Sequence, residues 1–370
     1  MREHHLPFSL CWAASSNKYR RSSFSSLADQ NPASRPDSVS FLHKVDPSLI
    51  GNDIRLFFKH ELSELARRHQ LEGWPTDEQI DVLCRRAAGL FAYAVATVKF
   101  LDSSTHLPEQ QLDVILSFPE STVPEGKTRF NSNINLDSLY ASIFESAFGE
   151  EDTEMESKVR STVGVVVLVV NPLPPSGIAE LIGLNPKEVT MFLRSLHSLL
   201  TLDEDPSKPV KPFHKSFPDF ITDHSRCTNP RFYVSPENAH LELVMNCLRV
   251  MNGGLEQDLL SLPDYSLNSE VEDLETRIDD RISDALQYAC RSWHNHLTNT
   301  GGDVNDLIFH LRAFLEEKFL AWQEVVSVLG AVRGAIAALE QLIFWLREVR
   351  VDLVTPLSVA NTYNASGVWG

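Results

Sequence analysis

The sequence has no long hydrophobic run, no paired-cysteine motif and no complete phosphate-binding loop, and each absence excludes a class of protein. The apolar run Val163 to Val170 is far shorter than the ~18 residues that a membrane-spanning helix needs. The five cysteines lie far apart and form no C-x-x-C motif, so the sequence predicts no zinc site and buried thiols in a reducing compartment. We therefore expect a cytoplasmic protein that does not bind membranes.

A short segment resembles the end of a phosphate-binding loop, but its surroundings do not fit one. Gly126-Lys127-Thr128 would need a glycine five residues earlier, where the chain has Ser121. The tripeptide also follows Phe118-Pro119 instead of a buried strand. We interpret it as a chance occurrence and expect no ATP-binding loop in this chain, no cofactor and no enzymatic activity.

The charge balance argues against binding to nucleic acids. The chain has 370 residues with a formal net charge of −17 and an isoelectric point near 5.2. Neutralising a phosphate backbone requires clustered lysine and arginine, which an acidic chain supplies only in local patches. The length predicts roughly two or three domains.

Hydrophobic periodicity predicts a mainly α fold. Ile54, Phe58, Leu62 and Leu65 recur at helical spacing in a helix expected to begin near Asn52 or Asp53. Thr76 and Gln79 form a capping-box pattern that opens a second helix, running to about Leu101. Between residues 234 and 350 further helical patterns predict a C-terminal helical bundle.

The pattern in the middle of the chain, a helix followed by two short paired strands, predicts a winged helix with a two-stranded wing. A helix from Pro186 to Leu200 leads into a short strand at Leu199 to Leu202, and Val210 to Phe213 pairs back after a turn. The run Val163 to Val170 is left open, since its valines favour a strand and periodicity cannot settle so short a run.

His214 is the candidate site residue, because it lies between the second wing strand and a helix start. One interpretation is a structural imidazole buried by Phe213 and Phe217; the other is a hydrogen-bond donor to a nucleotide phosphate from a neighbouring domain.

An alternative function for the chain is that of a winged-helix DNA-binding regulator, although the helix that would enter the groove has only Lys187 and Arg194 as basic residues. Duplex binding with a log–log salt slope steeper than about −3 would favour that alternative. A hydrolase or transferase is a third hypothesis, for which no residue constellation is found.

Several segments, in their order and spacing, resemble fungal NACHT proteins of the STAND NTPase class. The segments are Ser34-Arg35-Pro36, DIRLFFKHELSELARR (53–68), WPTDEQIDVLCRRAAGLFAYAVATVKFL (74–101), LDSLYASIF (136–144), PFHKSFPDFITD (212–223), LQYACRSWHNHL (286–297) and LEEKFLAWQEVVSVLGAVRGAI (315–336). The resemblance implies that Val163 to Val170 is helical. It also implies that Arg35 and His214 contact the nucleotide.

The resemblance further implies a division of the chain. We expect a disordered or unrelated segment at 1–33, a NACHT remnant with a helical subdomain at 34–118, a winged-helix domain at 134–226, a helical linker domain at 234–350 and a tail at 351–370. The phosphate loop and the propeller repeats of complete members are missing, so the chain is expected to be a truncated, non-catalytic regulatory fragment with protein partners. ATP or ADP would be contacted only if an upstream nucleotide domain is supplied, and the roles of Arg35 and His214 are expected to be vestigial without it.

Overall fold

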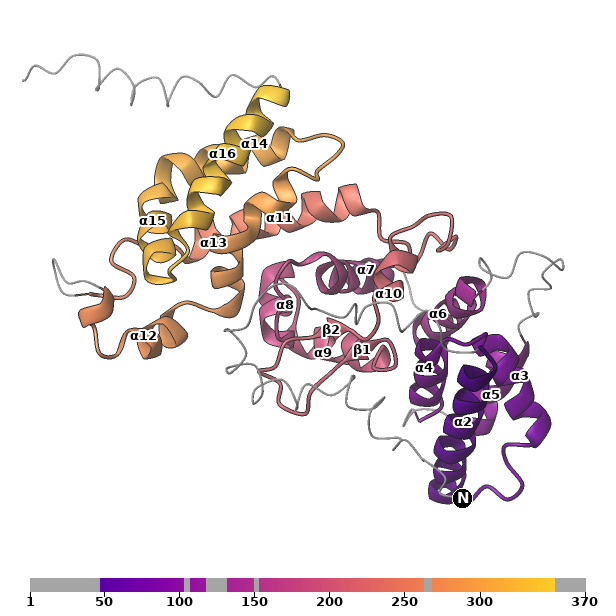
Figure 1. The fold of residues 1–370 in the computed structure, drawn as a ribbon. Helices are drawn as coiled ribbons and strands as arrows, with labels where there is room; N and C mark the ends of the chain where they lie inside the picture. Colours follow the sequence, from indigo (N-terminus) through magenta and orange to yellow (C-terminus); the bar gives the residue numbers. More distant parts are fainter. Residues whose placement is uncertain (1–46, 103–106, 118–131, 150–152, 263–267, 350–370) are drawn as a thin grey trace, which may run out of the picture. The chain divides into compact units, whose positions relative to one another are not determined.

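The structure is a computed structural model that describes residues 47–102, 107–117, 132–149, 153–262 and 268–349 (Figure 1). Its contacts divide the chain into residues 1–50 and 51–370. Four features predicted from the sequence lie outside the described residues: the segment 1–33, Arg35, the Gly126-Lys127-Thr128 tripeptide and the tail 351–370.

The described residues are mainly α-helical, which confirms the predicted fold class. The first group of helices is α2 (Pro47–His69), α3 (Asp77–Ala87), α4 (Phe91–Leu101), α5 (Pro108–Ser117) and α6 (Ser132–Phe148). The predicted capping box is present at the start of α3, where the Thr76 hydroxyl accepts from the Gln79 amide and the Gln79 side chain accepts from the Thr76 amide. Ile54, Phe58, Leu62 and Leu65 form the buried face of α2, as their spacing predicts.

The second group contains a two-stranded antiparallel sheet among helices. Its elements are α7 (Thr153–Leu168), α8 (Pro175–Ile182), α9 (Pro186–Ser195), β1 (Leu200–Thr201), β2 (Lys211–Pro212) and α10 (Ser216–Ile221). Leu200 pairs with Pro212, and Thr201 pairs with Lys211. The Asn185 side chain accepts from the Lys187 amide and caps α9, with Pro186 at the first helical position.

The C-terminal group is helical throughout its described residues. It comprises α11 (Pro236–Gly254), the 3₁₀ turn η3 (Asn268–Glu270), α12 (Leu274–Arg281), α13 (Asp284–Leu297), α14 (Asn305–Ala313), the π-helical turn η4 (Phe314–Lys318), α15 (Phe319–Val328) and α16 (Val332–Glu348). An aromatic cluster of Trp293, Phe314 and Trp322 forms its core, and the Trp322 indole donates to the Cys290 carbonyl at 3.0 Å. Among the helices of the described part, none combines the length and apolar character that crossing a bilayer requires.

The valine-rich run is helical as far as Leu168, as the resemblance implies and against its strand propensity, while Val169 and Val170 lie beyond the helix end. Val163 and its neighbours belong to α7, whose buried side chains include Val159, Thr162, Val163 and Val166. This spacing of three, one and three residues is helical, and it becomes visible only when residues before Val163 are included. Packing of that face outweighs the modest strand preference of valine.

Three predicted helix boundaries are wrong. The helix expected from Pro186 to Leu200 is α9, which ends at Ser195. The expected single helix from residue 76 to Leu101 is divided into α3 and α4, because Ala88 and Gly89 take left-handed conformations with φ of 46° and 82°. The first helix begins at Pro47 and passes through the expected start at Asn52 and Asp53. Proline at a first helical turn loses no hydrogen bond there, which makes Pro47 a suitable start.

Candidate functional site

The connection between β2 and α10 positions His214. The Phe213 amide donates to the Leu199 carbonyl at 2.8 Å, which continues the pairing of the two strands by one residue. The helix α10 begins at Ser216, two residues after His214. His214 is therefore fixed between a strand pair on one side and a helix start on the other, and its side chain is half-buried.

The hydrogen bonds of His214 define which of its nitrogens carries the proton. The Ser216 backbone N–H donates to His214 Nδ1 at 3.2 Å, and the Ser216 hydroxyl lies 2.7 Å from the same nitrogen. Since a backbone N–H can only donate, Nδ1 is an acceptor and the proton of the neutral ring is on Nε2. Burial, with a smaller effect of the neighbouring Lys215, holds the pKa of His214 below its ordinary value. His214 is thus a neutral imidazole with Nε2–H available as a donor.

Tyr140 on α6 completes this arrangement from a distant part of the sequence. Its hydroxyl lies 2.8 Å from Ser216 Oγ, and burial raises the pKa of Tyr140 to about 12. The Tyr140 ring also contacts Phe217 and Phe220 at centroid distances of 5.7 and 5.5 Å. A relay in which Tyr140 donates to Ser216 and Ser216 donates to His214 Nδ1 satisfies all three groups.

The aromatic residues around His214 have different roles. Phe217 and Phe220 are buried and belong to the core. Phe213 is half-buried, and the Lys99 ammonium lies 4.2 Å from the centre of its ring. Burial lowers the pKa of Lys99, and the carbonyl of the same residue lies 2.8 Å from His197 Nε2. These contacts bring the end of α4 to the β1–β2 pair.

Ion pairs connect α6 and α7 to the segment after α10. Arg226 donates two hydrogen bonds to the Asp137 carboxylate, at 3.0 and 2.6 Å, with both side chains largely buried. Arg231 donates to Glu156 at 2.5 Å and to the Phe148 and Gly149 carbonyls at the end of α6. This geometry holds α6 against the segment that carries His214.

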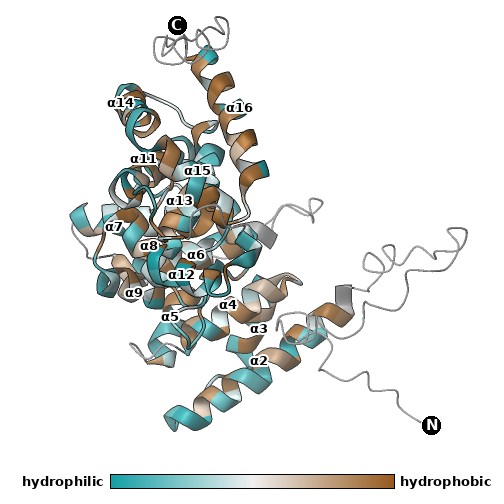
Figure 2. Cartoon of the chain, turned by 90° about the vertical axis from the view of Figure 1, so that its left-hand side faces the viewer, coloured by the Kyte–Doolittle hydropathy of each residue, from teal (hydrophilic) through white to brown (hydrophobic). Residues whose placement is uncertain are grey.

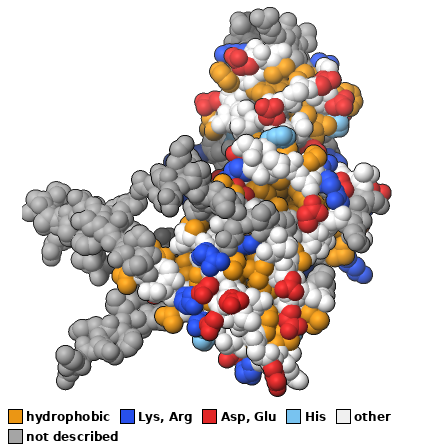
Figure 3. Space-filling model, turned by 90° about the vertical axis from the view of Figure 1, so that its right-hand side faces the viewer, with side chains coloured by type: hydrophobic (Ala, Val, Ile, Leu, Met, Phe, Trp, Pro, Cys, Tyr) orange, Lys and Arg blue, Asp and Glu red, His pale blue; other side chains and the backbone are white. Residues whose placement is uncertain are grey.

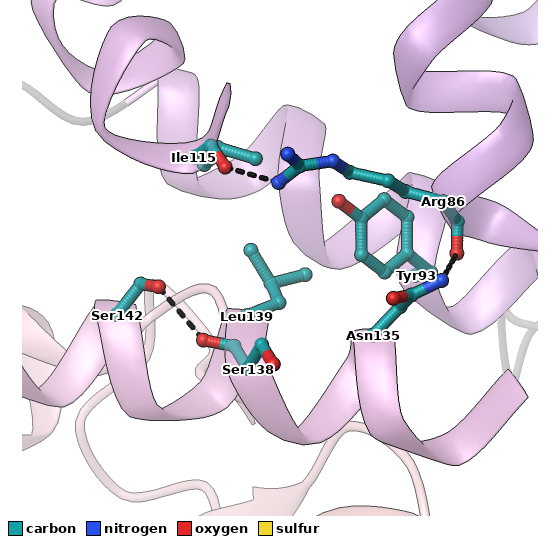
Figure 4. A pocket seen from close by; sticks show the side chains of 7 residues that line it. All are labelled: Arg86, Tyr93, Ile115, Asn135, Ser138, Leu139 and Ser142. Carbon is teal, nitrogen blue, oxygen red and sulfur yellow. Dashed lines mark hydrogen bonds between the residues drawn. The ribbon is translucent and has the colours of Figure 1, made fainter. Parts of the chain in front are cut away.

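A small pocket lies beside the other face of α6 (Figure 4). It is lined by Arg86, Tyr93, Ile115, Asn135, Ser138, Leu139 and Ser142, which come from α3, α4, α5 and α6. Arg86 donates to the Ile115 and Leu116 carbonyls near the end of α5, and Asn135 donates to the Arg86 carbonyl at 3.0 Å. The cavity volume of about 10 Å³ accommodates about one water molecule, so the pocket is too small for a nucleotide.

Sequence reasoning identified His214 but missed Ser216, Tyr140 and Lys99. A serine two residues after a histidine at a helix start is a recognisable local signal for the first of these. Tyr140 lies 76 residues before Ser216, and its spacing predicts only a buried helix face. Arg35 lies outside the described residues, so its expected role beside His214 stays a prediction.

Charged residues do not segregate on the face shown in Figure 3. Lysine and arginine side chains there are interspersed with acidic ones. Within the described residues, no group of three or more His, Cys, Asp and Glu side chains has the geometry to hold a metal ion.

Comparison with known proteins gives one informative match. No family model matches the chain, and no solved structure matches it. The vegetative incompatibility protein HET-E-1 of Podospora anserina is 22% identical over 319 residues. The match covers 79% of this chain but only 22% of HET-E-1, so the chain spans about a fifth of that relative. This similarity supports a relationship to the NACHT proteins that the sequence motifs resemble.

Proposed function

We propose that the chain is a cytoplasmic, non-catalytic regulatory segment of a NACHT-type signalling switch, which works through protein partners and has no ATP-binding loop of its own. Two findings support the proposal: the similarity to HET-E-1 over most of the chain, and the order of helices and paired strands from α7 to α10. In this proposal residues 134–226 form a winged helix and residues 234–350 a helical linker.

The single observation that carries the proposal is the state of His214. Its Nδ1 accepts from the Ser216 amide, so its Nε2–H remains as a neutral donor at the junction of β2 and α10. A neutral donor can hydrogen-bond an anionic oxygen, such as that of a phosphate, without requiring protonation of the ring. His214 thus fits a sensor of a phosphate group presented by a neighbouring nucleotide domain.

The contacts of α6 give this sensor a route to the rest of the chain. Tyr140 on α6 binds the Ser216 hydroxyl, and Asp137 on the same helix binds Arg226 after α10. A shift of α10 on release of a phosphate would therefore act on α6. We infer that this coupling converts the nucleotide state of a complete switch into a change of packing.

Exposed apolar side chains on α16 support a role in protein interaction. Val332, Ile336, Ile343 and Phe344 are between 45% and 62% exposed. Figure 2 shows apolar residues along this helix. Apolar side chains that recur along one exposed helix are typical of protein contact surfaces.

Calorimetric titration of the full chain with Mg·ATP and Mg·ADP tests the proposal. We expect no binding at micromolar concentrations, because the chain is expected to have no loop that cradles phosphates. Micromolar binding to the isolated chain would contradict it.

A second titration supplies the nucleotide domain in trans. The chain is mixed with an ADP-loaded nucleotide domain of a NACHT protein, and binding of wild type is compared with that of His214→Ala. Loss of a hydrogen bond to a charged group should weaken binding about tenfold or more. His310→Ala, which changes a histidine on α14 that is half-buried like His214, is the matched control and should bind as wild type. Equal binding by the two variants would remove His214 from the proposal.

A further inference from the structure

A chain of hydrogen bonds joins the segment just after α7 to α13 and α11. The helices α11 and α13 lie side by side in Figure 1. His296 on α13 is fully buried. Its Nε2 lies 2.6 Å from the Tyr288 hydroxyl, and its Nδ1 lies 2.9 Å from Nδ1 of His240 on α11. The Val170 amide, just after α7, donates to the Tyr288 hydroxyl at 3.4 Å. Four groups from three segments are therefore joined end to end.

One direction of the bonds satisfies every group in this chain. The Val170 N–H can only donate, so the Tyr288 oxygen accepts it. His296 Nε2 is the acceptor that lies beside the Tyr288 hydroxyl in the described contacts, so the Tyr288 hydrogen is satisfied when it points to that nitrogen. Neutral His296 then carries its proton on Nδ1 and donates to His240 Nδ1. His240 in turn carries its proton on Nε2, and its side chain is half-buried.

Few titratable groups face this chain. Tyr288 and His294 on α13 lie beside His296, and Cys247 on α11 lies near Tyr288. From α7 the facing group is the backbone amide of Val170. Neither His240 nor His296 has a carboxylate partner within the described part of the molecule. No negative charge therefore compensates a proton placed on either ring.

The other charged groups near these helices are engaged elsewhere. Their contacts are Glu242 with the Ser161 hydroxyl of α7, Glu180 of α8 with the Ser283 hydroxyl, Arg249 with the Glu180 and Leu181 carbonyls, Lys318 of η4 with the Leu255 carbonyl, and His310 of α14 with the Asp306 carbonyl. Glu237 on α11 is exposed. On α16, which packs on α13, Glu340 and Arg347 are exposed.

Protonation is incompatible with the closed chain. If His240 gains a proton on Nδ1, that N–H meets the Nδ1–H of His296. The two N–H groups no longer face each other if His296 moves its proton from Nδ1 to Nε2. The Tyr288 oxygen then accepts from both the Val170 amide and His296 Nε2, and the buried hydrogen of the Tyr288 hydroxyl has no acceptor. A buried donor without an acceptor is costly, and so is an uncompensated buried charge.

We propose that the Tyr288–His296–His240 chain is an acid-sensitive latch between α11 and α13, closed while both imidazoles are neutral and opened when they are protonated. The latch lets a fall in pH loosen the C-terminal helices independently of any nucleotide.

The size of the effect follows from the difference between the closed and open states. An open imidazole titrates near pH 6.5, whereas burial lowers the pKa of His296 to about 3 and also lowers that of His240. The closed state is therefore fully favoured above about pH 6.5 and loses stability as the pH falls below that value. Each imidazole raises the ratio of open to closed molecules by up to about tenfold per pH unit. Two imidazoles give up to about 100-fold between about pH 7.5 and pH 5.5.

The first test reads the tautomers of wild-type protein directly. Long-range ¹H–¹⁵N correlation spectra of the full chain at about pH 7.5 should show His296 protonated on Nδ1 and His240 on Nε2. The assignments come from the loss of each signal in His296→Gln and His240→Asn. A proton on Nε2 of His296, or a charged His240, would overturn the proposal even if no variant folds well.

The second test measures opening. Hydrogen exchange of α13 amides, corrected for the chemical exchange rate, is compared at about pH 7.5 and pH 5.5. His240 and His296 together should raise the opening of wild type by up to about 100-fold at the lower pH. The contribution of His294 comes in addition and is the same in every variant. His240→Asn keeps an acceptor for His296 but cannot be protonated, so its increase should be smaller than that of wild type by up to about tenfold. The control His60→Asn, at an exposed histidine of α2, should behave as wild type. An unchanged increase in His240→Asn would refute the latch.

Discussion

The packing of α6 against α10 can be tested by removing one phenylalanine ring. Phe144 is 1% exposed, and its ring contacts those of Phe148, Phe217 and Phe232 at centroid distances of 6.2, 6.0 and 5.1 Å. Truncating a fully buried phenylalanine to alanine costs about 3–5 kcal/mol, because apolar contact is lost and a cavity remains. A folded domain has a total stability of only about 5–15 kcal/mol, so Phe144→Ala should remove a large part of it.

The assay is thermal and urea unfolding followed by circular dichroism. At about 2–4 °C per kcal/mol, the midpoint of thermal unfolding should fall by roughly 6–20 °C. Phe309→Ala is the matched control, since Phe309 on α14 is 71% exposed and its truncation should change stability by less than about 0.5 kcal/mol. If the two variants lost similar stability, the described contact between α6 and the His214 segment would be wrong.

Three further predictions concern single contacts. Thr76→Ala removes the capping box of α3 and should cost about 1 kcal/mol in urea unfolding; no measurable loss would contradict the cap. Asp137→Asn leaves the largely buried Arg226 without its charged partner and should cost about 2–3 kcal/mol in urea unfolding. Glu64→Gln at an exposed pair is the control and should leave the stability nearly unchanged, so equal losses in the two variants would refute the distinction. Burial raises the pKa of Tyr93 to about 12, so the Tyr93→Phe variant should lack a component near pH 12 in a tyrosinate absorbance titration. The stability of the wild-type protein should fall above about pH 10, because the tyrosine of the unfolded chain releases its proton at a lower pH than that of the folded chain. A component lost near pH 10 instead would count against burial of this ring.

Long, regular hydrophobic patterns were sufficient to predict the fold class. The stripe on α2 and the capping box of α3 depend on residues within one helix, and local sequence specifies them. The valine run shows the limit of this reasoning, because its partners in the core decide between helix and strand. The break between α3 and α4 depends on two left-handed residues, of which only Gly89 carries a sequence signal.

The candidate site was predicted only in part. His214 could be found because it lies between two local patterns, a wing strand and a helix start. The state of its ring could not, since it depends on the geometry at Ser216 and on Tyr140 from a different helix. The same holds for the pair His240 and His296, which come together only when α11 packs on α13.

Opposite sides of α6 serve two separate sets of partners. Asn135 and Leu139 line the small cavity with α3, α4 and α5, while Tyr140 and Phe144 meet the rings of α10. A helix of 17 residues is a stiff rod about 25 Å long. A stiff helix moves as one body, so a displacement of α6 at its contacts with α10 also displaces its contacts at the small cavity.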